Sequence, residues 1–167
     1  AASDVYKRQI VFWLMGRLWA ADWAKVASSF PPILLGTLGL FLFSRELNLI
    51  LLGERTAIDL GVEVERTRKL VLVLSSLVTS AAVGVAGVIG FVGLIIPHVM
   101  RILVGPDHRV LLPASALGGA VFLVLADTLA RWAMAPTELP VGIITAIFGV
   151  PFFLFLLRRR KRTMGFD

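Results

Sequence analysis

Residues 70–97 read LVLVLSSLVTSAAVGVAGVIGFVGLIIP, a run of 28 residues without a charged side chain. A bilayer core of about 30 Å is crossed by roughly 20 apolar residues in a helix, so a run of this kind indicates a membrane protein. As one straight helix it would be about 42 Å long, which is too long for an ordinary upright span.

The second half of this run contains its own break signals. Glycine weakens a helix interior by about 1 kcal/mol relative to alanine. We therefore predict one span over residues 70–88, followed by a bend and a short returning helix within 89–103. A bend at membrane depth must face protein or a water-filled cavity, so we expect it to be buried or to line a pathway. One tilted helix with a glycine-rich packing face is the alternative. The residues concerned are Gly84, Gly87, Gly90, Gly93 and Pro97.

Three further apolar runs are long enough to span a bilayer. They predict helices at 26–44, 111–131 and 139–157. The whole chain of 167 residues is 57% hydrophobic and only 17% charged, whereas about a quarter of a soluble domain is charged. We therefore predict an all-α integral membrane protein, a polytopic helical bundle. The absence of cysteine excludes disulfides, thiolate metal sites and cysteine nucleophiles.

The orientation follows from the positions of Lys and Arg. Twelve of the 17 lie in residues 45–69, 101–109 and 158–162. We therefore place 45–69, the turn at 104–110 and the tail at 158–167 in the cytoplasm. The net charge of +6 reflects this distribution rather than a nucleic-acid-binding face. Arg17, Lys25, Arg131 and the loop 132–138 are then expected outside.

The N-terminal residues 1–9 (AASDVYKRQ) are polar and do not resemble a signal peptide. We expect them to be non-native or disordered, and the missing initiator Met suggests a fragment. Residues 10–25 are interpreted as the end of a preceding helix and an outer loop. Trp13, Trp19 and Trp23 suit a membrane–water boundary.

The cytoplasmic segment 45–69 is too long for a tight connection. Its part NLILLGERTAIDLGVEVERTRK (48–69) alternates apolar and charged residues and is punctuated by Gly53 and Gly61. This pattern predicts one or two short amphipathic helices. Such a helix rests on the membrane or docks in a groove of a partner. Because its charge is mixed, we favour a docking site.

Several motifs together resemble the C-terminal half of the FecCD-type permeases, membrane subunits of ATP-binding-cassette importers for ferric siderophores, haem and vitamin B12. The motifs are GFVGLIIPHVMRILVGPDHRVLLPASALGGAVFLVLADTLAR (90–131), ELPVGIITAIFGVPFFLFLL (138–157) and the RELN–LGE–LGV pattern within 45–62. The resemblance covers about 13–159.

This resemblance implies a fold of about ten helices per subunit, of which about the last five are present, in a dimer in the bacterial inner membrane. It implies two cytoplasmic ATPase subunits and an extracytoplasmic substrate-binding protein as partners, together with membrane lipid. It does not identify the cargo or say whether the dimer is homomeric. The ATPase-coupling segment implied by it comprises Leu52, Gly53, Glu54, Ala57, Leu60, Gly61 and Val62.

Arg131 has two interpretations. It follows Asp127 by four residues in a helix, so a local ion pair worth about 0.3–0.5 kcal/mol is possible. By the resemblance, an arginine at this outer position contacts an acidic residue of the binding protein. Both roles are compatible.

The remaining polar residues indicate structural roles. His98 and His108 lack the neighbours that a metal site needs, even with Asp107 beside the second, so we expect no metal and no cofactor. Glu138 and Pro140 are expected to begin the last helix. Gly149 and Pro151 are expected to kink it or to line the pathway, together with Gly87, Gly90, Gly93 and Pro97.

We therefore predict a transport permease that is not an enzyme. The chain has no GxxxxGK[ST] phosphate loop, so its energy would come from a partner ATPase. A membrane-embedded enzyme would need nucleophile and base within reach of each other, and Asp127 and His98 are expected to lie apart. Half of a secondary transporter would need ionisable residues near the midplane, and the spans contain almost none.

Overall fold

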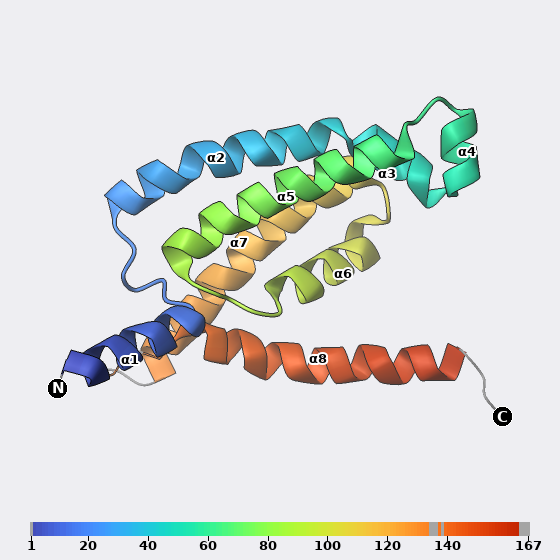
Figure 1. The fold of residues 1–167 in the computed structure, drawn as a ribbon. Coiled ribbons are helices and arrows are strands. Elements are labelled where there is room, and N and C mark those ends of the chain that lie inside the picture. Colours follow the sequence, from blue (N-terminus) through green and yellow to red (C-terminus); the bar gives the residue numbers. More distant parts are fainter. Residues whose placement is uncertain (1, 134–136, 138, 164–167) are drawn as a thin grey trace.

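The computed structural model describes residues 2–133, 137 and 139–163, and within them the secondary structure is entirely helical (Figure 1). The short helices α3 and α4 lie at one end of the bundle, and α1 lies at the other. The helices described are α1 (Ala2–Leu14), α2 (Trp23–Leu42), α3 (Ser44–Leu51), α4 (Glu54–Asp59), α5 (Val64–Ala86), α6 (Val92–Val104), α7 (His108–Ala133) and α8 (Val141–Thr163).

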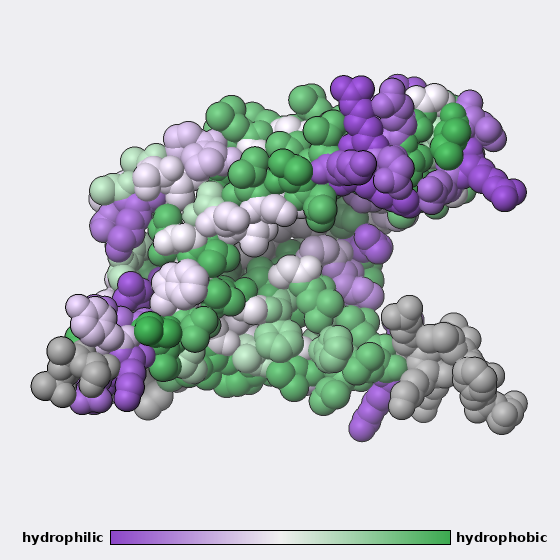
Figure 2. Space-filling model, viewed as in Figure 1, coloured by the Kyte–Doolittle hydropathy of each residue, from purple (hydrophilic) through white to green (hydrophobic). Residues whose placement is uncertain are grey.

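Four of the described helices are long and apolar enough to cross a membrane: α2, α5, α7 and the part of α8 up to Arg159. The shorter α6 is also apolar. In Figure 2 apolar side chains cover the middle of the bundle, while hydrophilic ones gather around α3, α4 and the start of α5. The prediction of an all-α, polytopic membrane fold is therefore confirmed.

Close packing of the helices depends on small residues. Helix α2 packs along α5, and α6 packs against both α7 and α8. Gly36 of α2 lies directly against the side chain of Val78, and a Cβ on Gly118 of α7 would be only 2.6 Å from Cε of Met100 in α6. Small residues let helix backbones approach closely in lipid, where association relies on packing rather than on the hydrophobic effect.

The long apolar run is divided into two helices. Helix α5 ends at Ala86 and α6 begins at Val92. The backbone turns where Gly87 (φ 74°) and Phe91 (φ 68°) adopt positive φ angles. The regular glycine spacing is therefore not what sets the break. Gly84 and Pro97 lie inside helices, and Gly90 and Gly93 are not among the residues with positive φ.

The length of α6 indicates that this break lies within the thickness of a bilayer. Helix α5 is long enough to cross a membrane, but the 13 residues of α6 are only about 20 Å long. This is shorter than a hydrocarbon core of about 30 Å. The irregular residues 87–91 therefore need partners for their backbone groups within the protein.

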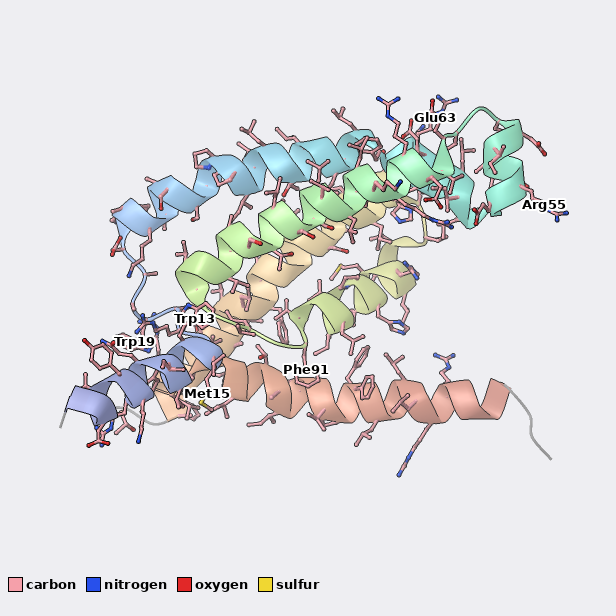
Figure 3. The ribbon with its side chains drawn as sticks, viewed as in Figure 1. Trp13, Met15, Trp19, Arg55, Glu63 and Phe91 are labelled. Carbon is pink, nitrogen blue, oxygen red and sulfur yellow. The ribbon has the colours of Figure 1, made fainter. Side chains whose placement is uncertain are left out.

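Residues 13–17 supply these partners. The N–H of Arg17 donates to the carbonyl of Ala86 (2.8 Å), and the N–H of Val88 donates to the carbonyl of Trp13 (3.1 Å). The N–H of Gly142, in the first turn of α8, donates to the carbonyl of Met15 (3.0 Å). We call these three hydrogen bonds the outer junction. Trp13 and Met15 lie where the end of α1 meets the start of α8 (Figure 3).

An apolar cluster lies beside the outer junction. Ala126 and Ala130 of α7 pack with Val141 and Ile144 of α8, and all four are buried. Leu18, Ile89 and Leu139 cover this cluster. Segments that are far apart in the sequence therefore converge at one end of the bundle and hold the start of α8 in place.

Several predicted boundaries differ from the structure. The expected disorder of residues 1–9 is wrong for residues 2–9, which belong to α1. Helix α5 begins six residues before the predicted residue 70, at Val64, because its charged first turns continue the apolar helix. Helix α8 likewise continues through the basic residues 158–162 and ends at Thr163. Helix α2 begins at Trp23, where Asp22 caps it by accepting a hydrogen bond from the N–H of Lys25 (2.8 Å).

The outer junction predicts that Gly142→Ala destabilises the fold. A Cβ at this position would collide with the carbonyl of Met15, and overpacking of this kind typically costs about 1–3 kcal/mol. Gly119→Ala in α7 is the matched control, because a Cβ there meets nothing within 4 Å. Thermal unfolding of the full-length protein in detergent measures the difference. A lower midpoint is expected only for Gly142→Ala, and equal midpoints would contradict the assignment.

Candidate docking segment, apolar groove and family

Residues 44–63 form a compact unit, which we call the docking segment after the role predicted for it. It contains α3, α4 and the turns that follow each of them. Ala57 is fully buried and packs with Val62 and with Val64 at the start of α5. Leu49 and Ile50 of α3 complete this small core. The segment is therefore fixed against the bundle by its own apolar contacts.

Two glycines make the turns of the docking segment possible. Gly53 (φ 125°) separates α3 from α4, and Gly61 (φ 85°) follows α4. Residues other than glycine rarely adopt these φ angles. Just after Gly61, the N–H of Val62 donates to the carbonyl of Ala57 (2.9 Å) and closes the unit. Both glycines were noted in the sequence, and their positive φ angles explain why glycine is needed at each position.

An ion pair links α4 to the extended start of α5. Arg68 places Nη2 3.0 Å from Oε2 of Glu54 and Nη1 3.4 Å from Oε1, so the pair is bidentate. Both side chains are about half exposed, and such a pair contributes at most about 1 kcal/mol. Its value here is geometric, since it fixes the direction of α4. Sequence reasoning missed Arg68, because nothing local shows that α4 folds back to it.

The outer surface of the docking segment is apolar. Leu52 is 70% exposed and Ile58 56% exposed, and Leu51 and Leu60 are exposed as well. A groove of about 920 Å³ runs beside Ile58. Arg55 projects from α4 away from the bundle (Figure 3). The groove is lined by Glu54, Ile58, Gly61, Val62, Glu63, Val64, Glu65, Arg66, Lys69 and Leu70.

The predicted coupling residues thus divide into three groups. Ala57 and Val62 are buried in the core of the segment, while Gly53, Glu54 and Gly61 set its shape. Leu52 and Leu60 expose large apolar side chains. Leu51 and Ile58 belong to the same surface, and the period of the short helices is the signal that would have found them.

A second groove, of about 710 Å³, lies beside the helix break. Its lining is almost entirely apolar and comes from the end of α1, the break itself and α8. Of the predicted bend or pathway residues, Gly90 and Pro151 line it, whereas Gly93 and Pro97 lie in α6 and do not. The lining comprises Leu14, Met15, Val88, Gly90, Phe91, Gly142, Ile143, Ala146, Ile147, Val150 and Pro151.

Phe91 holds the break beside this groove. Its left-handed conformation is costly for a residue with a Cβ, by about 1–2 kcal/mol. Its ring rests directly on Gly149 of α8, where any larger residue would collide with it. Its carbonyl accepts hydrogen bonds from the N–H groups of Leu94 (3.0 Å) and Ile95 (2.9 Å) and so starts α6. Sequence reasoning favoured the glycines here and missed Phe91.

Arg131 lies near the end of α7 that is opposite the docking segment. Its Nε is 2.8 Å from Oδ2 of Asp127, so the local ion pair is present. The Arg131 side chain is nevertheless 59% exposed, whereas Asp127 is largely covered. The ion pair orients the guanidinium without burying it.

The two histidines have different surroundings. The ring of His98 packs edge-on against Phe152 of α8, with centroids 5.5 Å apart. His108 lies beside Asn48 of α3. Among the described residues no three His, Asp or Glu side chains come together as a metal site would require. Glu138 lies outside the described residues, and Pro140 is buried just before α8.

Asp107 precedes α7 and caps it. Its Oδ1 accepts hydrogen bonds from the N–H of Arg109 (2.9 Å) and from the side-chain amide of Asn48 (2.7 Å). The bond from Arg109 is the larger cause that lowers the pKa of the Asp107 carboxyl, and the amide of Asn48 adds to it. Asp107 is therefore an anion at neutral pH, and it joins the docking segment to the turn between α6 and α7.

Known proteins share both the sequence and the fold. The cobalamin import system permease protein of Halobacterium salinarum is 54% identical over 154 residues, which are 92% of this chain and 41% of that protein. The hemin transport system permease protein of Yersinia pestis is 47% identical over 98% of this chain and 49% of its own length. The Fe(3+) dicitrate transport system permease protein FecD of Escherichia coli is 46% identical over 90% of this chain.

A solved structure, described as an inward-facing conformation of a metal-chelate type ABC transporter, superposes with a TM-score of 0.84 at 42% identity. It covers 91% of this chain, and this chain covers 49% of it. The chain spans about half the length of the relatives that it matches. The family model that matches residues 1–159 is that of the FecCD transport family. The motifs, the helical arrangement and these matches agree, and the chain belongs to the FecCD transport family.

Proposed function

We propose that this chain is part of the permease subunit of an ATP-binding-cassette importer that carries an iron chelate, haem or cobalamin across the cell membrane. Support comes from the relatives, whose names refer to cobalamin, hemin and Fe(3+) dicitrate. These cargoes differ in shape but are all bulky metal chelates. Relatives occur in archaea as well as bacteria, and a bacterial inner membrane is the location that we propose.

The docking segment is the observation that carries this proposal. It presents exposed Leu52 and Ile58 beside a groove with charges of both signs, on a unit held by its own core. A helix that only rested on anionic lipid would need a mainly basic polar face. A preorganised apolar surface with a polar rim instead suits a protein partner. We assign this partner as the cytoplasmic ATPase subunit, which supplies the energy for transport.

The apolar groove beside the break supports the proposal that this half of the permease lines part of the translocation pathway. Its walls come from α1, residues 88–91 and α8. The remaining walls would come from the rest of the permease and from a second permease copy. A largely apolar wall with few charges binds a bulky chelate only weakly, which suits a passage better than a binding site.

Arg131 supports docking of a substrate-binding protein at the outer face. Its guanidinium is exposed and oriented by Asp127. Nε donates to Asp127, and the N–H donors of the two terminal nitrogens lie in the same fixed plane and can bind a carboxylate on a partner. We therefore propose that Arg131 contacts an acidic residue of the binding protein.

Leu52→Glu and Ile58→Glu should each weaken binding of the ATPase subunit. Both side chains are exposed, so the fold is preserved while a charge enters an apolar interface, where it loses its hydration. Co-purification of the ATPase subunit with the full-length permease is the measurement. Ala21→Glu, an exposed apolar position at the opposite end, is the control and should retain full yield. Equal yield from all three variants would remove the docking role.

Arg131→Glu should slow association of the binding protein, and added salt should weaken the wild-type complex in the same direction. Asp127→Ala is the matched variant, because it removes the ion pair and keeps the guanidinium. Affinity in nanodiscs at two salt concentrations is measured for both. We expect a large loss for Arg131→Glu and a small one for Asp127→Ala. If binding is unchanged in folded Arg131→Glu, the residue has only its local role.

A further inference from the structure

One side chain of the docking segment reaches across to a different part of the chain. Nδ2 of Asn48 in α3 donates to Oδ1 of Asp107 (2.7 Å). Oδ1 of Asn48 accepts a hydrogen bond from the backbone N–H of His108 (2.8 Å). The orientation of the amide is fixed, because a backbone N–H only donates and a carboxylate only accepts at neutral pH.

The residues that Asn48 holds are the connection between α6 and α7. This connection is short, running from the end of α6 at Val104 to the start of α7 at His108. The N–H of Gly105 (φ 88°) donates to the carbonyl of Arg101, and the N–H of Leu111 donates to the carbonyl of Asp107. The first bond closes the end of α6, and the second ties the start of α7 to Asp107. A displacement of Asp107 is therefore passed on to α7 through this bond and to α6 through the two residues of chain, 105 and 106, that join them.

The opposite end of α6 adjoins the apolar groove. Phe91, which precedes α6, lines the groove and rests on Gly149 of α8. Midway along α6, His98 packs against Phe152 of α8. Helix α6 therefore extends from the residues that Asn48 holds to the wall of the groove. In Figure 1 it runs as a separate short helix between α7 and α8.

We propose that Asn48 is a positioning residue that couples the docking segment to α6, through its hydrogen bonds to Asp107 and His108. This inference rests on the proposed function, in which the docking segment binds the ATPase subunit. When ATP binding displaces the docking segment, Asn48 pulls the turn before α7, and α6 shifts Phe91 beside the groove. Without Asn48, the ATPase still docks through the surface around Leu52 and Ile58, but α6 does not follow.

The chain offers a charge-exchange test. Asn48→Asp places a second carboxylate against Asp107, where the amide of Asn48 donates a hydrogen bond in the wild-type protein. Adding Asp107→Asn restores one donor and one acceptor between positions 48 and 107, with their roles exchanged. Asn48→Ala removes the hydrogen bonds without adding a charge. Because Asn48 is only partly buried, this last variant keeps the assay informative if Asn48→Asp does not fold.

The readout is a distance between spin labels on the full-length permease in complex with its ATPase subunit. Labels at Phe30→Cys in α2, away from the docking segment, and Ile102→Cys in α6 use exposed positions, and this part of the protein has no cysteine of its own. The distance is measured without nucleotide and after trapping with ATP and vanadate. In otherwise wild-type protein it should change. In Asn48→Asp and Asn48→Ala, the fraction of molecules that show the changed distance after trapping should fall on the order of tenfold. The double variant should regain most of this fraction.

Co-purification and ATP hydrolysis are measured in the same samples. Loss of the distance change with the ATPase still bound and active supports coupling through Asn48. An unaltered distance change in folded Asn48→Ala, or no recovery in the double variant, would overturn the inference. If the ATPase does not bind even the otherwise wild-type permease, it is the proposed function that fails.

Discussion

A helix that breaks within a membrane leaves backbone N–H and C=O groups that lipid cannot satisfy, and each one costs several kcal/mol if it stays unpaired. In this protein the break between α5 and α6 meets that constraint through residues 13–17, whose backbone pairs with Ala86, Val88 and Gly142. The outer junction allows α6 to turn back, because it replaces the helical hydrogen bonds that the break removes. It also fixes the start of α8 and, with it, one wall of the apolar groove.

The two ends of the bundle consequently have different characters. The end that carries α1 is held by backbone hydrogen bonds and by small buried side chains such as Ala126 and Ala130. The end that carries α3 and α4 is held by a separate small core and by side-chain hydrogen bonds from Asn48. Polar side-chain contacts at a partly exposed site contribute only about 1 kcal/mol each and exchange readily with water. Movement is therefore more readily accommodated at the end that carries α3 and α4.

Much of this arrangement could be predicted from local sequence. Long uncharged runs identify the membrane helices, and the charged, glycine-punctuated residues 45–69 identify the docking segment. The features that were missed depend on contacts between distant residues. Phe91 adopts a left-handed conformation because Gly149 of another helix leaves space for its ring, and Arg68 matters because α4 folds back to it. Residues 2–9 were predicted to be disordered because they are polar, but they form one helix with the apolar end of α1.

The outer junction is tested most directly by hydrogen–deuterium exchange at the amides of Arg17, Val88 and Gly142 in the full-length protein in nanodiscs. The account predicts that all three exchange far more slowly than an unstructured peptide at the same pH, because each donates to a carbonyl within 2.8–3.1 Å. The amides of Val88 and Arg17 should lose their protection together when the junction opens, since both depend on residues 13–17. Exchange of Val88 at the rate of an unstructured peptide, in a protein whose spans stay protected, would contradict the account.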